Sequence, residues 1–413
     1  MSKPNPFRGA TAIVGIGQTP YYKRGASPDP EIKLALRAIV AACEDAGIDP
    51  SEIDGFVSYG SERNAGQKLL PALGTKSLRY AALAWTHGGG IPAAVGIAAQ
   101  AIISGQAEVV VVYRAMAEGS NQRLQVAVTQ DDTPAQFLVN GIDMVLQRSA
   151  QRSQRMIEVD GVPASTLEAV AMAGYHHAQH NPGATAFGQP LTHEKYVASR
   201  YISEPYHLFD CSRENDGAAA VILVSAERAA RMPQKPAYIL GCTMGASHDG
   251  GSREDNHEPY TSVGLIELAQ RLWEQTGYRP EDVDVAQIYE NFSGMAVASI
   301  IDHGFCTSAT AGDFITLDNL TAPDGQLPIN TSGGNMADGF IHGMGLVLEA
   351  VRQIRGTSTN QVPGARLSLM AALGAEGRGL QDIDVMVTPW DVWRLRGSFS
   401  RAVFSHPPFS LSL

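Results

Sequence analysis

Short apolar runs alternate with amphipathic stretches along most of the chain. The run Thr11–Gly15 is β-branched and apolar and ends in glycine, which predicts a buried strand. Apolar residues at helical spacing follow, and they predict a helix over residues 30–46. Gly47 is typical of a helix C-terminus, and the next predicted strand ends at Tyr59.

The same succession of elements recurs in the second part of the chain. A predicted helix over 265–276 leads through the turn 277–284 to a predicted strand that ends at Tyr289. The residues that repeat at one offset, 277 − 47 = 230, are the pairs Gly47/Gly277, Pro50/Pro280, Asp54/Asp284 and Tyr59/Tyr289. Four identities at one spacing, in matching helix–turn–strand contexts, predict that the chain is a duplication.

Each half continues with glycines, a helix and a strand. In the first half the helix covers 91–104 and the strand 109–113, and in the second half they cover 344–354 and 366–370. Alternating helices and strands favour a largely parallel sheet with both faces covered. Two such halves predict an α/β protein built as a five-layer α/β/α/β/α sandwich.

The boundary between the halves is expected near Pro233, which gives an N-terminal half of residues 1–232 and a C-terminal half of 233–413. The first half includes an excursion over about 115–210 that is rich in Gln, Arg and His and poor in long apolar strands. We expect this excursion to pack over the active cleft or against a partner.

Charge, hydropathy and cysteine spacing narrow the classes of function. The net charge of −11 argues against a nucleic-acid surface, which needs clustered Lys and Arg. No apolar run reaches about 18 residues, so no membrane span is expected. The four cysteines are far apart and form no CxxC, which argues against a zinc site or a disulfide framework. These features favour a cytoplasmic protein.

Three motifs are better explained by structure than by chemistry. The stretch GIGQTP (15–20) lacks the third glycine of a dinucleotide loop, so a strand end and a turn are favoured. No HExxH or carboxylate pattern accompanies the histidines of the excursion, so solvated or hydrogen-bonded side chains are favoured over a metal site; they are His176, His177, His180 and His193. Cys211 has no base nearby in the sequence, and Asp216-Gly217 is typical of a turn into a strand.

Three other segments are candidates for ligand binding. The cluster Gly88–Gly90 at a helix start offers free N–H groups and the positive end of the helix dipole, although tight packing explains glycines equally well. The segment 330–345 has five glycines around His342, which is either functional or a hydrogen-bonded core histidine. Tyr289 ends a strand, where α/β sheets bind ligands, but an aromatic plug with a bonded hydroxyl is also common there.

Seven stretches, from the first strand nearly to the C-terminus, match one known family. They are VGIGQTP (14–20), AAQAIISGQAEVVVV (98–112), NPGA…PLTHEKYVASRYISEP (181–205), DCSRENDGAAAVILVS (210–225), YENF (289–292), GFC (304–306) and NTSGGNMADGFIHGMGLVLEAVRQIRG (330–356). With them the chain resembles the thiolase superfamily, and more narrowly the sterol-carrier-protein-2-type thiolases and the related lipid-transfer-protein aldolases. The resemblance implies a duplicated thiolase fold, a coenzyme A thioester as substrate, no covalently bound cofactor and a homodimer.

The departures from the family pattern concern its chemistry. Working thiolases begin the helix after the third strand with a nucleophilic cysteine and carry a second cysteine near the C-terminus. Here these places read THGGGIPAA (86–94) and LMAALGAEGRG (369–379), and none of the four cysteines lies in either. Without a thiolate, the acyl-enzyme route has no nucleophile.

The motif 289–292 is similar to that of the aldolases. Thiolases have Asn-Glu-Ala-Phe or His-Asp-Cys-Phe where this chain has Tyr-Glu-Asn-Phe. The aldolases with a tyrosine at this place cleave β-hydroxyacyl-CoA thioesters, as in steroid side-chain degradation. They work with a small OB-fold zinc-ribbon protein of the DUF35 type. They also carry a second tyrosine where Phe340 stands, in the stretch that matches the thiolase Gly-His-Pro motif.

The resemblance therefore implies a retro-aldolase, with Tyr289 as base or proton relay and His342 assisting directly or through water. Glu290 is a weaker candidate, because the next residue along a strand points to the opposite face. Backbone N–H groups of the two glycine loops would hold the enolate, and the expected substrate-binding residues are Gly88, Gly89, Gly90, Gly333, Gly334, Phe340 and Gly343. No metal is expected. A thiolase-type acyltransferase with an unusual nucleophile, a non-catalytic acyl-CoA-binding scaffold, and a dehydratase- or hydrolase-like enzyme stay open as alternatives.

Overall fold

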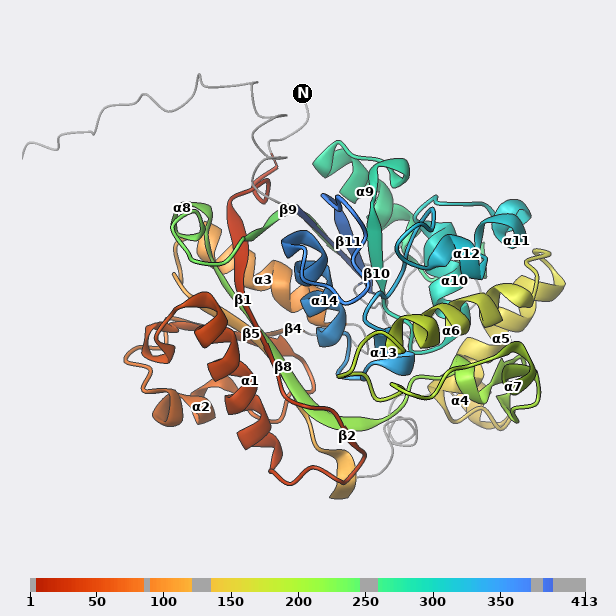
Figure 1. Cartoon of the computed structure of the whole chain (residues 1–413), viewed down its shortest axis with the longest axis horizontal. Coiled ribbons are helices and arrows are strands. Elements are labelled where there is room, and N and C mark those ends of the chain that lie inside the picture. Colours follow the sequence, from red (N-terminus) through yellow and green to blue (C-terminus); the bar gives the residue numbers. More distant parts are fainter. Residues whose placement is uncertain (1–4, 85–89, 121–134, 246–258, 373–381, 389–413) are drawn as a thin grey trace, which may run out of the picture.

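A curved mixed sheet runs through the protein in the computed structural model, which describes residues 5–84, 90–120, 135–245, 259–372 and 382–388 (Figure 1). Its order is β10-β11-β12-β9-β1-β8-β5-β3-β4, and the short strand β2 pairs with β8. The strands are β1 (Thr11–Gln18), β2 (Tyr22–Lys23), β3 (Gly55–Tyr59), β4 (Tyr80–Ala84), β5 (Val110–Met116), β8 (Asn215–Ser225), β9 (Ala237–Gly245), β10 (Val285–Ile288), β11 (Ser368–Ala372) and β12 (Asp382–Thr388), with a separate hairpin of β6 (Tyr201–Ser203) and β7 (Tyr206–His207).

The helices divide into layers and a lateral group. The layers are formed by α1 (Glu31–Ala46), α2 (Gly66–Leu73), α3 (Ile91–Ile103), α8 (Ala226–Ala229), α9 (Ile266–Thr276), α10 (Ser293–Asp302) and α14 (Met344–Arg355). The lateral group and the loops contain α4 (Ala135–Leu138), α5 (Val145–Glu158), α6 (Ser165–Ala178), α7 (His193–Val197), α11 (Ala311–Phe314), α12 (Leu317–Leu320) and α13 (Gly334–Ala337).

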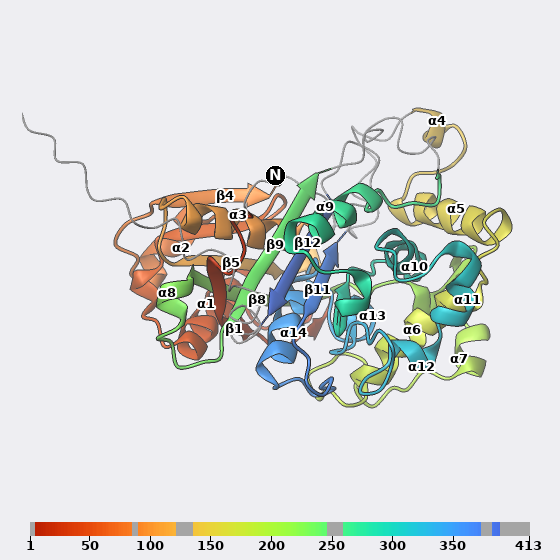
Figure 2. The ribbon, with the colours of Figure 1, turned by 90° about the horizontal axis from the view of Figure 1, so that it is seen from above.

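The five predicted layers are present. The two half-sheets join where β1 pairs with β9, at Ala12–Tyr238 and Ile13–Ala237. Between the half-sheets lie α3 and α14, both buried along nearly their whole length (Figures 1 and 2). On the outside, α1 covers the first half-sheet, and α9 with α10 covers the second. The apolar surfaces of both half-sheets thus face helices, as a layered α/β core requires.

The duplication predicted from the 230-residue offset has a physical counterpart at each repeated residue. Gly47 and Gly277 end α1 and α9 in the left-handed conformation, with φ of 68° and 71°. The carboxylate of Asp54 accepts hydrogen bonds from the N–H groups of Glu108 and Val109, just before β5. The carboxylate of Asp284 does the same for two N–H groups just before β11. Each repeated aspartate therefore ties its strand to the start of the neighbouring strand.

The prediction of a largely parallel sheet is wrong. Only β3–β4, β3–β5 and β10–β11 are parallel among the described strands, and the other pairs of the main sheet are antiparallel. The reason is that β8 lies between β1 and β5 and is reached through the long excursion instead of a helical crossover. The strand β12 likewise pairs antiparallel with both of its neighbours.

Two local predictions also change. The first strand continues to Gln18, and Gly15 and Gly17 lie inside it, where a Cβ would come within 2.1 and 2.3 Å of backbone oxygens of α1. These glycines therefore allow close strand–helix packing. Asp216-Gly217 is not a turn, because both residues belong to β8, and the Asp216 carboxylate accepts hydrogen bonds from Ser27 and Glu118 N–H groups.

The excursion packs beside the second half of the chain. Its helix α6 contacts α10, α12 and α13, and α5 contacts α10 (Figure 1). Since α13 belongs to the glycine-rich segment that precedes α14, the excursion supports that segment from one side. Among the described residues, no helix has the length and apolar character needed to cross a membrane.

Candidate active site

Tyr289 is held at the end of β10 from both sides. Its N–H donates to the carbonyl of Ala371 in β11 at 2.8 Å, and its side chain is buried. On the other side, the amide of Asn330 accepts from the Ile288 N–H at 2.7 Å and donates to the Ile288 carbonyl at 2.9 Å. The Asn330 side chain thus takes the place of a neighbouring strand and satisfies the backbone N–H and carbonyl of Ile288. This fixes the backbone that carries Tyr289.

His342 lies two residues before the start of α14, in an uncommon backbone conformation. Its φ is 47°, in the left-handed region that residues other than glycine seldom adopt. The residue is 6% exposed. Backbone strain of this kind persists only where the surroundings hold it, and it is frequent at functional sites.

An aromatic cluster forms around His342 from both halves of the chain. The centroid of its ring is 4.7 Å from that of Tyr59 at the end of β3 and 5.0 Å from that of Phe340. Phe340 in turn lies 6.4 Å from Tyr289. We call Tyr59, Tyr289, Phe340 and His342 the aromatic cluster. It lies where the two halves meet, and it brings together the two residues that were expected to be catalytic.

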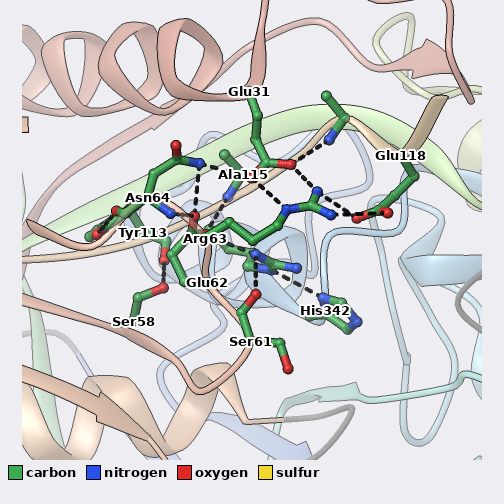
Figure 3. Close-up of polar contacts among 12 residues, drawn as sticks. Glu31, Ser58, Ser61, Glu62, Arg63, Asn64, Tyr113, Ala115, Glu118 and His342 are labelled. Carbon is green, nitrogen blue, oxygen red and sulfur yellow. Dashed lines mark hydrogen bonds and ion pairs between the residues drawn. The ribbon is translucent and has the colours of Figure 1, made fainter. Parts of the chain in front are cut away.

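A buried ion pair approaches the cluster from the first half. The Nε atom of Arg114 in β5 donates to Nδ1 of His342 at 3.1 Å, and its Nη1 lies 2.9 Å from a carboxylate oxygen of Glu62 (Figure 3). Both side chains of the pair are almost completely buried. Sequence reasoning did not single out either residue. The available signal was the charge of Arg114 next to a strongly apolar strand, because unpaired charges are rarely buried.

The charge state of His342 follows from these surroundings. Burial lowers the pKa of the imidazole well below its usual 6.5, and the positive charges of Arg114 and Arg63 lower it further. The ring is therefore uncharged at neutral pH.

Glu290 has a different task from its neighbour Tyr289. Its carboxylate accepts hydrogen bonds from the N–H and the side-chain amide of Asn335, at 2.6 and 3.1 Å, so it fastens the start of α13. Burial without a cation raises the pKa of Glu290 to about 8. As expected from the alternation of side chains, Glu290 binds this loop and makes no contact with the aromatic cluster among the described residues.

The glycines that were expected to bind substrate fall into three groups. Gly88 and Gly89 lie outside the described residues, and Gly90 precedes α3, where its carbonyl accepts from Ala94 N–H. The N–H of Gly333 is bonded to the Asn330 carbonyl, so the expected role of this N–H in holding an enolate is not supported. At Gly334 a Cβ would lie 1.8 Å from a carboxylate oxygen of Glu290, so close packing alone explains that glycine.

Gly343 and Phe340 do lie at the aromatic cluster. A Cβ on Gly343 would come within 3.1 Å of the Tyr289 ring. The Phe340 N–H donates to the Asn215 side chain at 2.5 Å, which ties the glycine-rich segment to the start of β8. Asn215 was not found from the sequence, because nothing in its local pattern indicates a partner 125 residues away.

Three of the four cysteines have thiols that are the reverse of activated. Burial raises the pKa of Cys43 and Cys211 to about 12 and that of Cys306 to about 11. Cys242 lies on β9 beside Gly96 of α3, and none of the four cysteines forms a disulfide bond. A high thiol pKa leaves almost no thiolate at neutral pH, which is the opposite of what nucleophilic catalysis needs.

The histidines of the excursion have structural surroundings. His177 is buried and accepts a hydrogen bond from Ala322 N–H at 3.0 Å, and His193 lies 2.7 Å from the Glu168 carboxylate. The interpretation as hydrogen-bonded histidines is confirmed for these two. Within the described ranges, no three His, Cys, Asp or Glu residues are grouped so that they could hold a metal ion.

A duplicated five-layer α/β fold, with an aromatic and histidine cluster where its halves meet, defines a thiolase-like protein. Comparisons with known proteins agree. Residues 245–380 match the family model described as "Thiolase C-terminal domain-like".

Two similar curated proteins cover nearly the whole chain. A 17-hydroxy-3-oxo-4-pregnene-20-carboxyl-CoA lyase of Mycobacterium tuberculosis is 36% identical, over 88% of this chain and 96% of that protein. A steroid side-chain-cleaving aldolase of Thermomonospora curvata is also 36% identical, over 89% and 95%. The solved structure titled "Ltp2-ChsH2(DUF35) aldolase" has a TM-score of 0.84 and 33% identity, over 93% of this chain and 98% of that one. The chain belongs to the thiolase superfamily.

Proposed function

We propose that the protein is a retro-aldolase that cleaves a carbon–carbon bond of a β-hydroxyacyl-CoA thioester. The observation that carries the proposal is the position of Tyr289, which is buried beside Phe340. Working thiolases rely on catalytic cysteines, and none of the four cysteines of this chain stands at those places in the sequence. The two relatives at 36% identity are named as a CoA-ester lyase and an aldolase, which supports the same reaction class.

The reaction needs one base and one set of hydrogen-bond donors. The base removes the proton of the β-hydroxyl, the bond between the α and β carbons breaks, and its electron pair moves into the thioester as an enolate. A ketone or aldehyde leaves, and protonation of the enolate carbon gives a shorter acyl-CoA. We assign Tyr289 as the base or proton relay and His342 as the group that assists it. Because a tyrosine pKa is ordinarily about 10, the neighbours of Tyr289 must help it to lose its proton.

Two kinds of partner fit this function. The similar solved structure is a complex whose title names a DUF35 protein, so we propose that this chain also works with a DUF35-type OB-fold zinc-ribbon protein. The edge strand β4 has one pairing partner, β3, among the described strands, and Leu83 on it is 47% exposed. An open edge of this kind suits pairing with a second copy, and we propose a homodimer.

The decisive experiment incubates the chain, with and without a DUF35-type protein, with a β-hydroxyacyl-CoA. The products are analysed by mass spectrometry. Wild type is expected to release a carbonyl compound and a shorter CoA thioester, and Tyr289→Phe is expected to lose this activity by about 10²-fold or more. Binding of the CoA ester should survive in the variant, since only a hydroxyl is removed. Full cleavage by Tyr289→Phe would disprove the assignment, and a covalent acyl adduct on the chain would indicate acyltransferase chemistry instead.

A further inference from the structure

The contact between Arg114 and His342 constrains where the histidine carries its proton. A guanidinium group has only donors and keeps its charge at any physiological pH. Since Nε of Arg114 points its N–H at Nδ1 of His342 at 3.1 Å, that ring nitrogen has to accept. A proton on Nδ1 would place two donors against each other, and it would add a positive charge beside a buried cation.

We propose that Arg114, held in place by Glu62, is a positioning residue that keeps His342 uncharged with its proton on Nε2, so that the ring presents a fixed hydrogen-bond donor to the oxygen of a bound thioester. This inference rests on the proposed function for the identity of the ligand. It makes the assisting role of His342 specific: the ring stabilises the developing oxyanion as a donor and does not take the proton of Tyr289, which removes the proton of the substrate.

Glu62 makes Arg114 a fixed donor. One carboxylate oxygen accepts from Arg114 Nη1 at 2.9 Å and from Ala115 N–H at 3.1 Å, and the other accepts from the N–H and the side-chain amide of Asn64. These four hydrogen bonds satisfy the carboxylate and hold it in place beside the guanidinium. A buried charge pair is tolerable only when its remaining donors and acceptors are satisfied in this way.

A second layer of ion pairs supports this arrangement (Figure 3). Arg63 contacts the carboxylates of Glu31 and Glu118, and Asn64, which bonds Glu62, also donates to Glu31 at 2.8 Å. The network ties the residues after β3 to the first turn of α1 and to the end of β5. The position of the Arg114 side chain is therefore set by several elements of the first half.

Two aromatic rings also pack against His342. Tyr59 lies on one side at 4.7 Å between centroids, with the Arg114 guanidinium 5.3 Å from the Tyr59 ring centroid, and Phe340 lies at 5.0 Å. A flip of the ring would put Cδ2 where Nδ1 lies and Cε1 where Nε2 lies, and it would have to displace these neighbours. In the described part of the chain Nε2 makes no hydrogen bond with the protein, so it is the nitrogen that is left for a ligand.

A first test observes the tautomer directly and does not require activity. The full-length protein is labelled with ¹⁵N-histidine, and the His342 resonances are assigned by their loss in His342→Gln. The proposal expects the neutral form protonated at Nε2 from pH 5.5 to 8. The titratable or charged groups that surround the ring are Tyr59, Glu62, Arg63, Arg114 and Tyr289. A neutral ring protonated at Nδ1, or an imidazolium at pH 7, would overturn the proposal whether or not the protein is an aldolase.

A second test removes the positioning pair without leaving one buried charge alone. The double variant Glu62→Gln/Arg114→Met is compared with wild type in the pH dependence of kcat/KM for a β-hydroxyacyl-CoA. The fall in kcat/KM at pH 8 is expected to be about 10-fold or more but below the roughly 10²- to 10³-fold cost of removing an oxyanion donor, because the histidine is still present. On the acid side, activity should be lost at a higher pH than in wild type, because the guanidinium charge no longer lowers the pKa of His342, although burial still holds that pKa below its usual value.

The matched control removes another ion pair that joins different elements. Arg355 of α14 contacts Asp45 of α1 at 2.7 Å and has no contact with His342. The double variant Asp45→Asn/Arg355→Met is expected to lower stability and leave the pH profile unchanged. If the control shows the same shift on the acid side, or if Glu62→Gln/Arg114→Met keeps the wild-type profile, Arg114 does not set the state of His342.

A third test asks which nitrogen acts. The side-chain amide of His342→Gln can place an N–H near the former Nε2, whereas that of His342→Asn reaches only the former Nδ1. We expect the Gln variant to retain at least about 10-fold more activity than the Asn variant. Asparagine tolerates a left-handed backbone better than most residues, so folding alone would favour the opposite order. Equal or greater activity of the Asn variant contradicts donation from Nε2.

Discussion

The ends of β3 and β10 carry two copies of one tyrosine, but their surroundings have diverged. After Tyr59 the chain continues into Ser61–Asn64, whose side chains form the network around Arg114, with Glu62 buried and Arg63 partly exposed. After Tyr289 it continues into Glu290, which fastens a glycine-rich loop through uncharged partners. One half therefore fixes the electrostatics of the site, and the other half carries the groups that we assign to the reaction.

The two carboxylates show why the same chemical group behaves differently in the two places. Glu62 faces the guanidinium of Arg114 in the buried interior. Glu290 is just as buried but is bonded to neutral amides, and its pKa rises to about 8. A buried carboxylate that has no cation beside it tends to take up a proton.

The largest expected effect separates the two tyrosines. Tyr289→Phe should reduce aldolase activity by about 10²–10⁴-fold, because a proton-transfer group is lost. Tyr59→Phe keeps the ring that packs on His342 and should stay within about 10-fold of wild type. Steady-state rates of both variants on one β-hydroxyacyl-CoA measure the difference. Equal losses would mean that the two halves share the chemistry.

The ion pair of the first half should dominate stability. Arg114→Met leaves Glu62 buried without its cation and is expected to lower the free energy of unfolding by about 3–5 kcal/mol. Replacing both residues, as in Glu62→Gln/Arg114→Met, should recover most of that loss. Urea unfolding monitored by circular dichroism measures both values, and an additive loss in the double variant would show that the pair is not coupled.

In the second half, Glu290 should make stability depend on pH. The pKa in the folded protein, about 8, lies above the ordinary 4.5, so the folded state binds the proton more tightly. The contribution of Glu290 to the free energy of unfolding is therefore fully present below about pH 4.5 and is lost as the pH rises through 8. Glu290→Gln should therefore reduce the fall in unfolding free energy between pH 5 and pH 8 by roughly 1–3 kcal/mol. An unchanged slope would show that the carboxylate is already ionised at pH 5.

The smallest expected effect compares the two repeated glycines that end α1 and α9. Gly277→Ala introduces a methyl group into open space, so only the left-handed backbone opposes it, at about 1 kcal/mol. Gly47→Ala carries the same strain, and its Cβ would also press on Pro233 at 3.2 Å. Thermal unfolding should rank Gly47→Ala below Gly277→Ala, and the reverse order would rule out this contact as the cause.

Much of the fold could be predicted because its signals are local. The glycines at 47 and 277 end helices, the prolines at 50 and 280 begin the next turns, and apolar runs mark β3 and β10. The prediction of a largely parallel sheet was wrong, since a run of apolar residues carries no information about which neighbour it pairs with. The positions of Tyr289 and His342 were found from their places at element ends and from the family resemblance.

The sequence by itself determined the repeated elements, the absence of a cysteine at the thiolase positions, and the two residues that we assign to the reaction. Only the tertiary structure decided what controls them. Arg114 and His342 are 228 positions apart, and Phe340 and Asn215 are 125 positions apart. Hydrogen bonds at such separations depend on how the half-sheets pack around α3 and α14. No local pattern predicts that packing, because the sequence around each residue indicates its own strand or loop and carries no information about the distant partner.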